Sequence, residues 1–99
     1  VPLFLDQLKG GVAEIKAALQ AHYRGSALVS VVEAKEMRLD PTALNNTDRM
    51  ELRVYADESK GQALLVSRLD NLGKGASGAA VQNLRLMLGM PQTASLAAE

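Results

Sequence analysis

The feature that most constrains the fold of this chain is a pair of strand-like segments joined by a short polar turn. In Met50–Tyr55, apolar and polar side chains alternate, which is the pattern of a strand with one buried face. Asp57–Gly61 is polar, and Gln62–Leu69 is again rich in apolar residues. Two strands around such a turn predict a β-hairpin.

The hydrophobic period changes to that of a helix earlier in the chain. Val12, Ile15, Leu19 and Tyr23 recur at the spacing of one helical face, with alanines between them that favour helix formation. Gly25 follows closely, as glycine often does after the last helical turn. This segment is predicted to be an amphipathic helix.

Shorter signals complete the chain. Val1–Leu5 and Leu28–Val32 are predicted to be strands, because both are apolar and the second is rich in β-branched residues. We expect a long, partly ordered loop over 33–48, with or without a short strand, and a second helix from about 76 to 88. A flexible tail is expected over 90–99. The order predicts an α+β fold: a mixed or antiparallel sheet with a helix on one face, and a C-terminal helix.

Charge and composition exclude several classes of function. Eleven basic residues balance eleven acidic ones, so nothing favours nucleic acid or an anionic membrane as partner. The chain has no cysteine and one histidine, His22, so we expect no metal site and no thiolate nucleophile. No apolar run reaches the length of about 20 residues that a membrane span needs. We expect a cytoplasmic protein.

The segment Gly73-Lys74-Gly75-Ala76-Ser77-Gly78 matches the G-x-G-x-x-G pattern of dinucleotide-binding domains. That interpretation also needs a second parallel strand and an acidic residue about 20 positions further on, at a strand end. Only about one helix follows here, so it fails. Two interpretations remain: a tight turn with close helix packing, or bare backbone and helix-end amides lying against a flat ligand. Spacing alone favours the tight turn.

The run Leu69-Asp-Asn-Leu-Gly-Lys-Gly-Ala-Ser-Gly-Ala-Ala-Val-Gln-Asn-Leu84 closely resembles the C-terminal signature of N-acetyl-γ-glutamyl-phosphate reductases. Val1–Leu3, Ala18–Tyr23 and Glu51–Tyr55 resemble the same family more weakly, especially its shorter bacterial type. A looser form of the signature occurs in aspartate-semialdehyde dehydrogenases, which are the alternative. A non-catalytic interaction module of the same fold is the third hypothesis.

The resemblance implies a place in a larger enzyme. Residues 1–89 would be the C-terminal part of a glyceraldehyde-3-phosphate-dehydrogenase-like catalytic and dimerisation domain, with 70–89 returning to the nucleotide-binding domain. The family reduces N-acetyl-γ-glutamyl phosphate to the semialdehyde with NADP in arginine biosynthesis, through a cysteine thioester and a histidine acid/base. Both catalytic motifs lie upstream of this segment in the family, so no catalytic residue is expected here. The implied partners are the rest of the enzyme, a second copy in a homo-oligomer, and a small-molecule substrate.

The resemblance also implies the cofactor-binding residues Asn71, Gly73, Lys74 and Gly75. Asn71 would lie beside the nicotinamide, because a side-chain amide can both donate to and accept from its carboxamide. The alternative is that Asn71 caps the turn. Gly73 and Gly75 would let the backbone pass under the ring. Lys74 would meet a phosphate, although a lysine in a polar turn is more often solvated.

The other polar and sulfur-containing side chains have simpler expected roles. His22 is expected on the surface of the first helix. Arginines near the hairpin are expected on a solvated face or in interface salt bridges, and methionines are expected to fill gaps in the core. The residues concerned are Arg49, Arg53, Arg68, Met37, Met50, Met87 and Met90.

Overall fold

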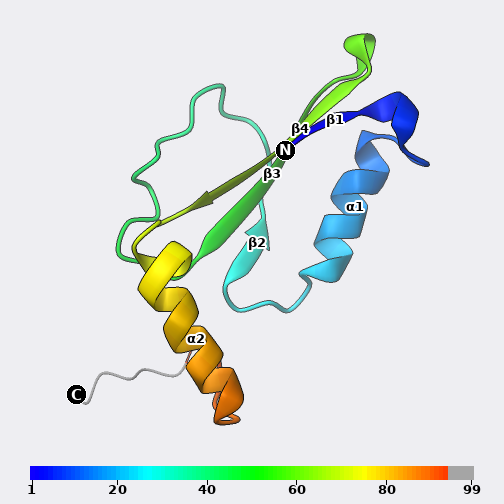
Figure 1. Cartoon of the computed structure of the whole chain (residues 1–99). Helices are drawn as coiled ribbons and strands as arrows, with labels where there is room; N and C mark the ends of the chain where they lie inside the picture. Colours follow the sequence, from blue (N-terminus) through cyan, green and yellow to red (C-terminus); the bar gives the residue numbers. More distant parts are fainter. Residues whose placement is uncertain (94–99) are drawn as a thin grey trace.

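A computed structural model of the chain describes residues 1–93 and shows a four-stranded sheet with two helices (Figure 1). The helices and strands are β1 (Pro2–Phe4), α1 (Val12–His22), β2 (Val29–Val31), β3 (Met50–Asp57), β4 (Gln62–Leu69) and α2 (Gly78–Met87). The predicted α+β class is confirmed.

The predicted hairpin forms the centre of the sheet. β3 and β4 pair antiparallel along their whole length, from Met50 opposite Leu69 to Asp57 opposite Gln62. β3 therefore extends to Asp57, whereas the strand predicted from side-chain alternation ended at Tyr55. A short 3₁₀ turn joins the strands and ends at Gly61, whose φ of 64° is a conformation that glycine adopts without a steric penalty.

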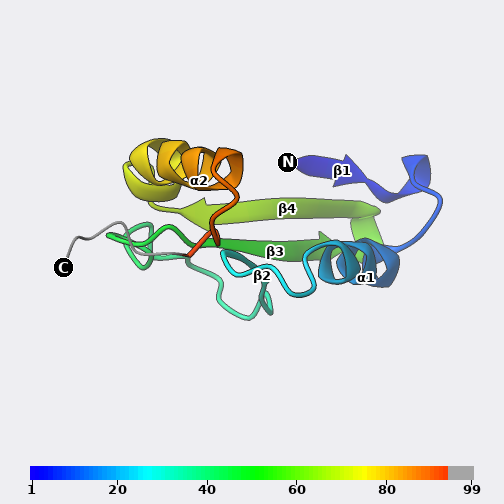
Figure 2. The ribbon, with the colours of Figure 1, turned by 90° about the horizontal axis from the view of Figure 1, so that it is seen from below.

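The two outer strands are short, and each pairs with one strand of the hairpin. The order is β1-β4-β3-β2, with β1 antiparallel to β4 and β2 parallel to β3 (Figure 2). The sheet is therefore mixed, as expected. Residues 33–48 contain no strand, so the short strand that we allowed for is absent there.

The two faces of the sheet differ in composition, because side chains alternate along each strand. The inner face carries Met50, Leu52, Val54, Ala56, Ala63, Leu65, Ser67 and Leu69 in register. The outer face carries Pro2, Phe4, Glu51, Arg53, Tyr55, Gln62, Leu64, Val66 and Arg68. α1 contacts β2 and β3. Leu19 of α1 and Tyr23, which follows the helix, line a hollow together with inner-face residues such as Leu52 and Leu65.

The described chain buries few apolar side chains. Leu44 and Ala63 are the buried apolar residues among positions 1–93, and no large side chain in that range is fully enclosed. The radius of gyration is 15.9 Å, whereas a compact chain of this length has about 13 Å. α2 contributes to this elongation, because it extends away from the sheet beyond the end of β4 (Figure 1). The sheet and its helices thus leave much apolar surface in contact with solvent.

Neither helix within residues 1–93 has both the length and the apolar character needed to cross a lipid bilayer.

We predict that the chain expressed alone at micromolar concentration self-associates or unfolds without a sharp transition, since so little apolar surface is buried. Sedimentation velocity and differential scanning calorimetry would measure both properties. A monomer with a cooperative transition typical of a complete domain would contradict this prediction.

Candidate functional site

The glycine segment forms a wide helical turn that continues into α2. Gly73–Ser77 is wound as a π-helical turn, with N–H groups of Gly75 and Ser77 bonding to the carbonyls of Asp70 and Leu72 at 3.0 and 3.1 Å. Winding thus begins before the position 76 predicted from sequence, while regular α-helix begins at Gly78. Such π-helical turns are uncommon in proteins, and those that occur are often found at functional sites.

Asp70 connects this turn to a segment far away in sequence. Its carboxylate accepts hydrogen bonds from the backbone N–H groups of Asn46, at 2.8 Å, and Leu72, at 3.1 Å. These bonds, the one from Asn46 first, hold the pKa of Asp70 below its ordinary value. Asn46 has a φ of 62°, a conformation that non-glycine residues adopt rarely. The bond between Asp70 and Leu72 is an Asx turn, which the sequence Asp-Asn after a strand could have indicated.

The close approach of residues 44–48 explains two of the glycines. A β-carbon on Gly73 would lie 2.5 Å from the carbonyl oxygen of Thr47. A β-carbon on Gly78 would lie 2.0 Å from Oδ1 of Asp48. A side chain at Gly73 would require the loop backbone at Thr47 to move, and one at Gly78 would require both the Asp48 side chain and the Gly73 carbonyl oxygen, 2.6 Å away, to shift. Both glycines therefore have a packing role that needs no ligand, as the tight-turn interpretation predicted.

Asn71 is exposed and takes no part in this packing. Asp70 occupies the capping position, and within residues 1–93 no hydrogen bond involves the Asn71 side chain. Its Oδ1 lies 2.9 Å from the point where a β-carbon on Gly75 would stand, so Gly75 leaves room for the amide. The side-chain amide of Asn71, which the family resemblance implied for cofactor binding, is thus exposed and does not act as a cap.

Lys74 is held against α2. Its Nζ donates a hydrogen bond to Oε1 of Gln82, and Nε2 of Gln82 donates to Oε1 of Gln92 at 3.0 Å. Two carboxylates, Asp48 and Asp70, lie against the same turn. The N–H of Leu72, at the start of the turn, already donates a hydrogen bond to the Asp70 carboxylate. Because a negative charge is already present there, the start of the turn suits an uncharged polar group better than a phosphate.

The chain after α2 folds back onto the helix as far as Gln92. The buried Arg85 donates from Nη1 to the carbonyl oxygen of Gln92 at 2.8 Å, and the N–H of Met90 bonds to the carbonyl of Arg85 at 2.8 Å. The remainder of the expected tail, from residue 94, lies outside the described residues.

A second polar cluster lies on the outer face of the sheet. Oε2 of Glu51 accepts hydrogen bonds from Arg53 at 2.9 Å and from Arg68 at 2.6 Å. Arg53 is only 4% exposed and also lies 3.6 Å from the Glu36 carboxylate. Burial alone would raise the pKa of Glu51, but the bonds from Arg68 and Arg53 outweigh it and the pKa is lowered. The two arginines form salt bridges within the chain, not on a solvated face or at an interface as expected, and the burial of Arg53 was not predicted.

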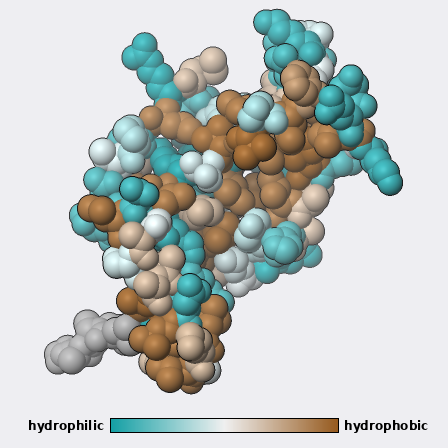
Figure 3. Space-filling model, in the orientation of Figure 1, coloured by the Kyte–Doolittle hydropathy of each residue, from teal (hydrophilic) through white to brown (hydrophobic). Residues whose placement is uncertain are grey.

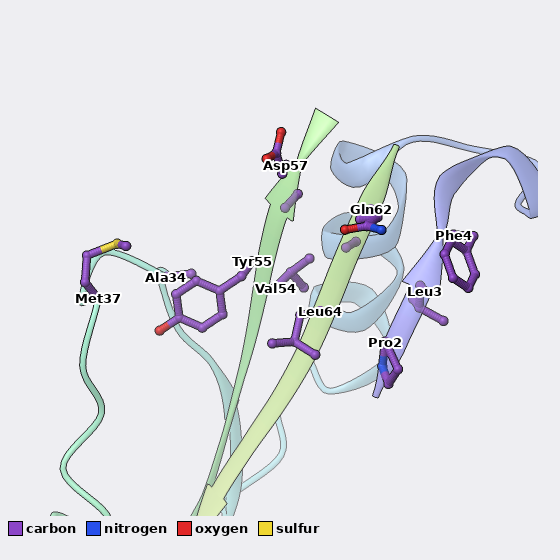
Figure 4. Close-up of a pocket in the computed structure, with 12 residues that line it drawn as sticks. Pro2, Leu3, Phe4, Ala34, Met37, Val54, Tyr55, Asp57, Gln62 and Leu64 are labelled. Carbon is purple, nitrogen blue, oxygen red and sulfur yellow. The ribbon is translucent and has the colours of Figure 1, made fainter. Parts of the chain in front are cut away.

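The cluster fastens residues 33–42, which we call the strap, to the outer face. The Tyr55 hydroxyl donates to the carbonyl of Glu36 at 3.0 Å, and Arg68 donates to the carbonyl of Asp40 at 3.2 Å. Between the strap and β1 lies an open hollow of about 670 Å³, lined by Met37, Tyr55, Leu64 and other residues (Figure 4).

Of the remaining single-residue predictions, the one for His22 is confirmed and the one for the methionines is wrong in part. His22 lies exposed at the end of α1, as expected, with its ring edge-to-face against Tyr23 at 4.7 Å. The prediction that the methionines fill core gaps is wrong for Met37 and Met87, which are 96% and 84% exposed. Sequence pattern alone missed this, because Met37 lies in a loop and Met87 lies at the end of α2, where its side chain is exposed.

Comparison with known proteins identifies the family. Residues 4–71 match the dimerisation domain of semialdehyde dehydrogenases. The chain belongs to this family. It is 52% identical over 95 residues to proteins named N-acetyl-γ-glutamyl-phosphate reductase in Brucella ovis, Brucella canis and Brucella suis. Each match covers 90% of this chain and 31% of the relative, so the chain spans about a third of the length of these reductases.

The match to the semialdehyde dehydrogenase dimerisation domain ends at residue 71, where the glycine turn begins. It therefore contains β2, β3, β4, α1 and the strap, and it leaves out α2.

We predict that Gly78→Ala destabilises this domain by about 1–3 kcal/mol, the usual cost of overpacking. Gly78 has helical dihedral angles, so helix propensity alone would make alanine stabilising there. A destabilising change would therefore report the clashes of the new β-carbon with Asp48 and with the Gly73 carbonyl oxygen. Urea unfolding of the protein that carries this chain would measure it.

The control is the same substitution in an Asp48→Ala background, which removes the nearest obstructing atoms. The cost of Gly78→Ala should fall there. An equal cost in both backgrounds would show that the loop contact is not its cause.

Proposed function

We propose that this chain is the C-terminal part of an NADP-dependent N-acetyl-γ-glutamyl-phosphate reductase, which makes N-acetylglutamate semialdehyde for arginine biosynthesis in the cytoplasm. The observation that carries the proposal is the 52% identity over 90% of the chain to proteins of that name. The signature from Leu69 to Leu84, which resembles the same family, agrees with it. Aspartate-semialdehyde dehydrogenase is the weaker candidate, because the named relatives favour the first reaction.

In this proposal, residues 1–89 belong to the catalytic and dimerisation domain, and 70–89 return to the nucleotide-binding domain, with 90–99 as a tail. The exposed apolar side chains of α2 support a partner for that helix. Apolar surface gathers over the free end of α2, as Figure 3 shows, and Leu84, Leu86, Met87 and Leu88 are all exposed there. Docking on the rest of the same enzyme would remove this surface from water.

NADP is the proposed cofactor, and it supplies the hydride for the reduction. Asn71 is the residue of this chain that fits it best, because its exposed amide matches the donor and acceptor of a carboxamide. Gly75 keeps the space beside that amide free of a side chain. Gly73 and Lys74 complete the turn, with Lys74 oriented through Gln82. Holding the carboxamide would fix which face of the nicotinamide ring is presented to the substrate.

We predict that the chain on its own has no reductase activity at any concentration. The proposed reaction passes through a thioester, which needs a thiol, and this chain contains no cysteine. The assay is NADP- and phosphate-dependent oxidation of N-acetylglutamate semialdehyde by the purified chain. Turnover would disprove the assignment of catalysis to another part of the enzyme.

We predict that Asn71→Ala in the complete reductase weakens NADPH binding and slows hydride transfer, each by about 1–3 kcal/mol, because a buried carboxamide loses its partner. Fluorescence titration of NADPH and single-turnover absorbance measurements would test this. The melting temperature without cofactor should change little, because the side chain has no hydrogen bond within residues 1–93.

Gln20→Ala provides the control, since it removes an exposed amide from α1. It should change neither property. If Asn71→Ala lowers stability but leaves cofactor affinity and turnover per folded molecule intact, then Asn71 has a structural role and the cofactor assignment is wrong.

A further inference from the structure

Asp70 lies between β4 and the glycine turn, and its side chain connects the turn to the loop that precedes β3. Oδ2 accepts a hydrogen bond from the backbone N–H of Asn46 at 2.8 Å, and Oδ1 accepts one from the N–H of Leu72 at 3.1 Å. The end of the loop therefore lies next to the start of the turn (Figure 1). Each oxygen of one carboxylate thus holds a different segment of the chain.

The loop on the far side of this connection is itself anchored. Leu44 is only 7% exposed, and its carbonyl accepts hydrogen bonds from both the N–H and the hydroxyl of Thr47, at 3.2 and 2.7 Å. Asn46 has a φ of 62°, and a non-glycine residue keeps such a conformation only where its surroundings hold it there. The bond to Asp70 is one of the contacts that hold it.

The backbone on both sides of Asn71 is fixed by hydrogen bonds. Before it, the Asp70 carbonyl accepts the N–H of Gly75 at 3.0 Å. After it, the Leu72 N–H donates to the Asp70 carboxylate, and the Leu72 carbonyl accepts from the N–H and the hydroxyl of Ser77, at 3.1 and 2.8 Å. The Asn71 side chain has no hydrogen bond of its own within residues 1–93. The position of its amide is therefore set through the backbone.

We propose that Asp70 is a positioning residue for Asn71. It ties the backbone of Asn71 to the anchored loop over 44–48, so that the amide is already in place when a nicotinamide carboxamide binds. Asp70 acts through Asn71, because both of its carboxylate oxygens already accept hydrogen bonds within the chain. This proposal rests on the proposed function, in which Asn71 binds that carboxamide, and deepens it by naming what holds the amide.

A preorganised amide has two measurable consequences. A turn that is already ordered does not have to be ordered when the cofactor binds, so the affinity is higher. A ring that is held in one orientation also transfers hydride faster. A merely structural Asp70 would have neither effect: its loss would lower stability, while each folded molecule would bind NADPH as before.

The test is a double-mutant cycle in the complete reductase, with Asp70→Ala, Asn71→Ala and the double variant. Fluorescence titration gives the dissociation constant of NADPH, and single-turnover absorbance gives the rate of hydride transfer. We expect Asp70→Ala to raise the dissociation constant about tenfold when Asn71 is present, and less than about twofold when Asn71 is already alanine. The rate of hydride transfer should fall in the same pattern.

Two further variants support the cycle. Asp70→Asn keeps one acceptor oxygen instead of two, so it should fold even where Asp70→Ala does not, and it should raise the dissociation constant about threefold. Asp57→Ala is the control. It removes a carboxylate that accepts a hydrogen bond from Ser59 at the opposite end of the hairpin, and it should change neither measurement.

The outcomes separate this proposal from the proposed function. An equal effect of Asp70→Ala in both backgrounds would overturn the positioning role and leave the proposed function standing. Unchanged NADPH affinity and hydride transfer in both Asp70 variants would do the same. If Asn71→Ala changes neither measurement, the cofactor assignment is wrong and the positioning role is wrong with it.

Discussion

The antiparallel pairing of β3 and β4 is the interaction on which the other parts of the structure depend. β1 and β2 are three-residue strands that pair with the hairpin and not with each other. The strap is attached to Arg53, Tyr55 and Arg68, all on the hairpin strands. Loss of the hairpin would therefore release the outer strands, the strap and the outer-face ion cluster together.

The same arrangement leaves much apolar surface of the described chain uncovered. A hairpin of two eight-residue strands, with short outer strands, offers two sheet faces, and α1 covers part of one. The apolar surface that remains lies in separate places: beside α1, around the hollow between the strap and β1, and along α2. Such surfaces stabilise a protein only when another layer covers them. A dimerisation domain within a larger enzyme supplies both kinds of cover, which agrees with the family to which the chain belongs.

Local periodicity was enough to predict the hairpin and α1, because residues within each of those segments determine the pattern. Side-chain alternation placed Leu52 and Val54 on one face before the structure was known. The association of residues 44–48 with the glycine turn could not be predicted, since it depends on Asp70 meeting Asn46, 24 positions away. For the same reason the burial of Arg53 beneath the strap was missed. The proposed cofactor role of Asn71 comes from family resemblance alone, because spacing alone favoured a cap.

The glycine segment shows how one sequence pattern can have two physical causes. In a dinucleotide-binding domain, G-x-G-x-x-G brings bare backbone and free amides to a pyrophosphate. Here the absence of side chains at Gly73 and Gly78 leaves room for Thr47 and Asp48. The Asp70 carboxylate accepts a hydrogen bond from a backbone N–H at the start of the turn. Carboxylates of the chain itself thus lie at the start of the turn, where the motif would bind an anion. In the proposed function, the group that remains for a ligand is the uncharged amide of Asn71, which favours a carboxamide over a phosphate at this turn.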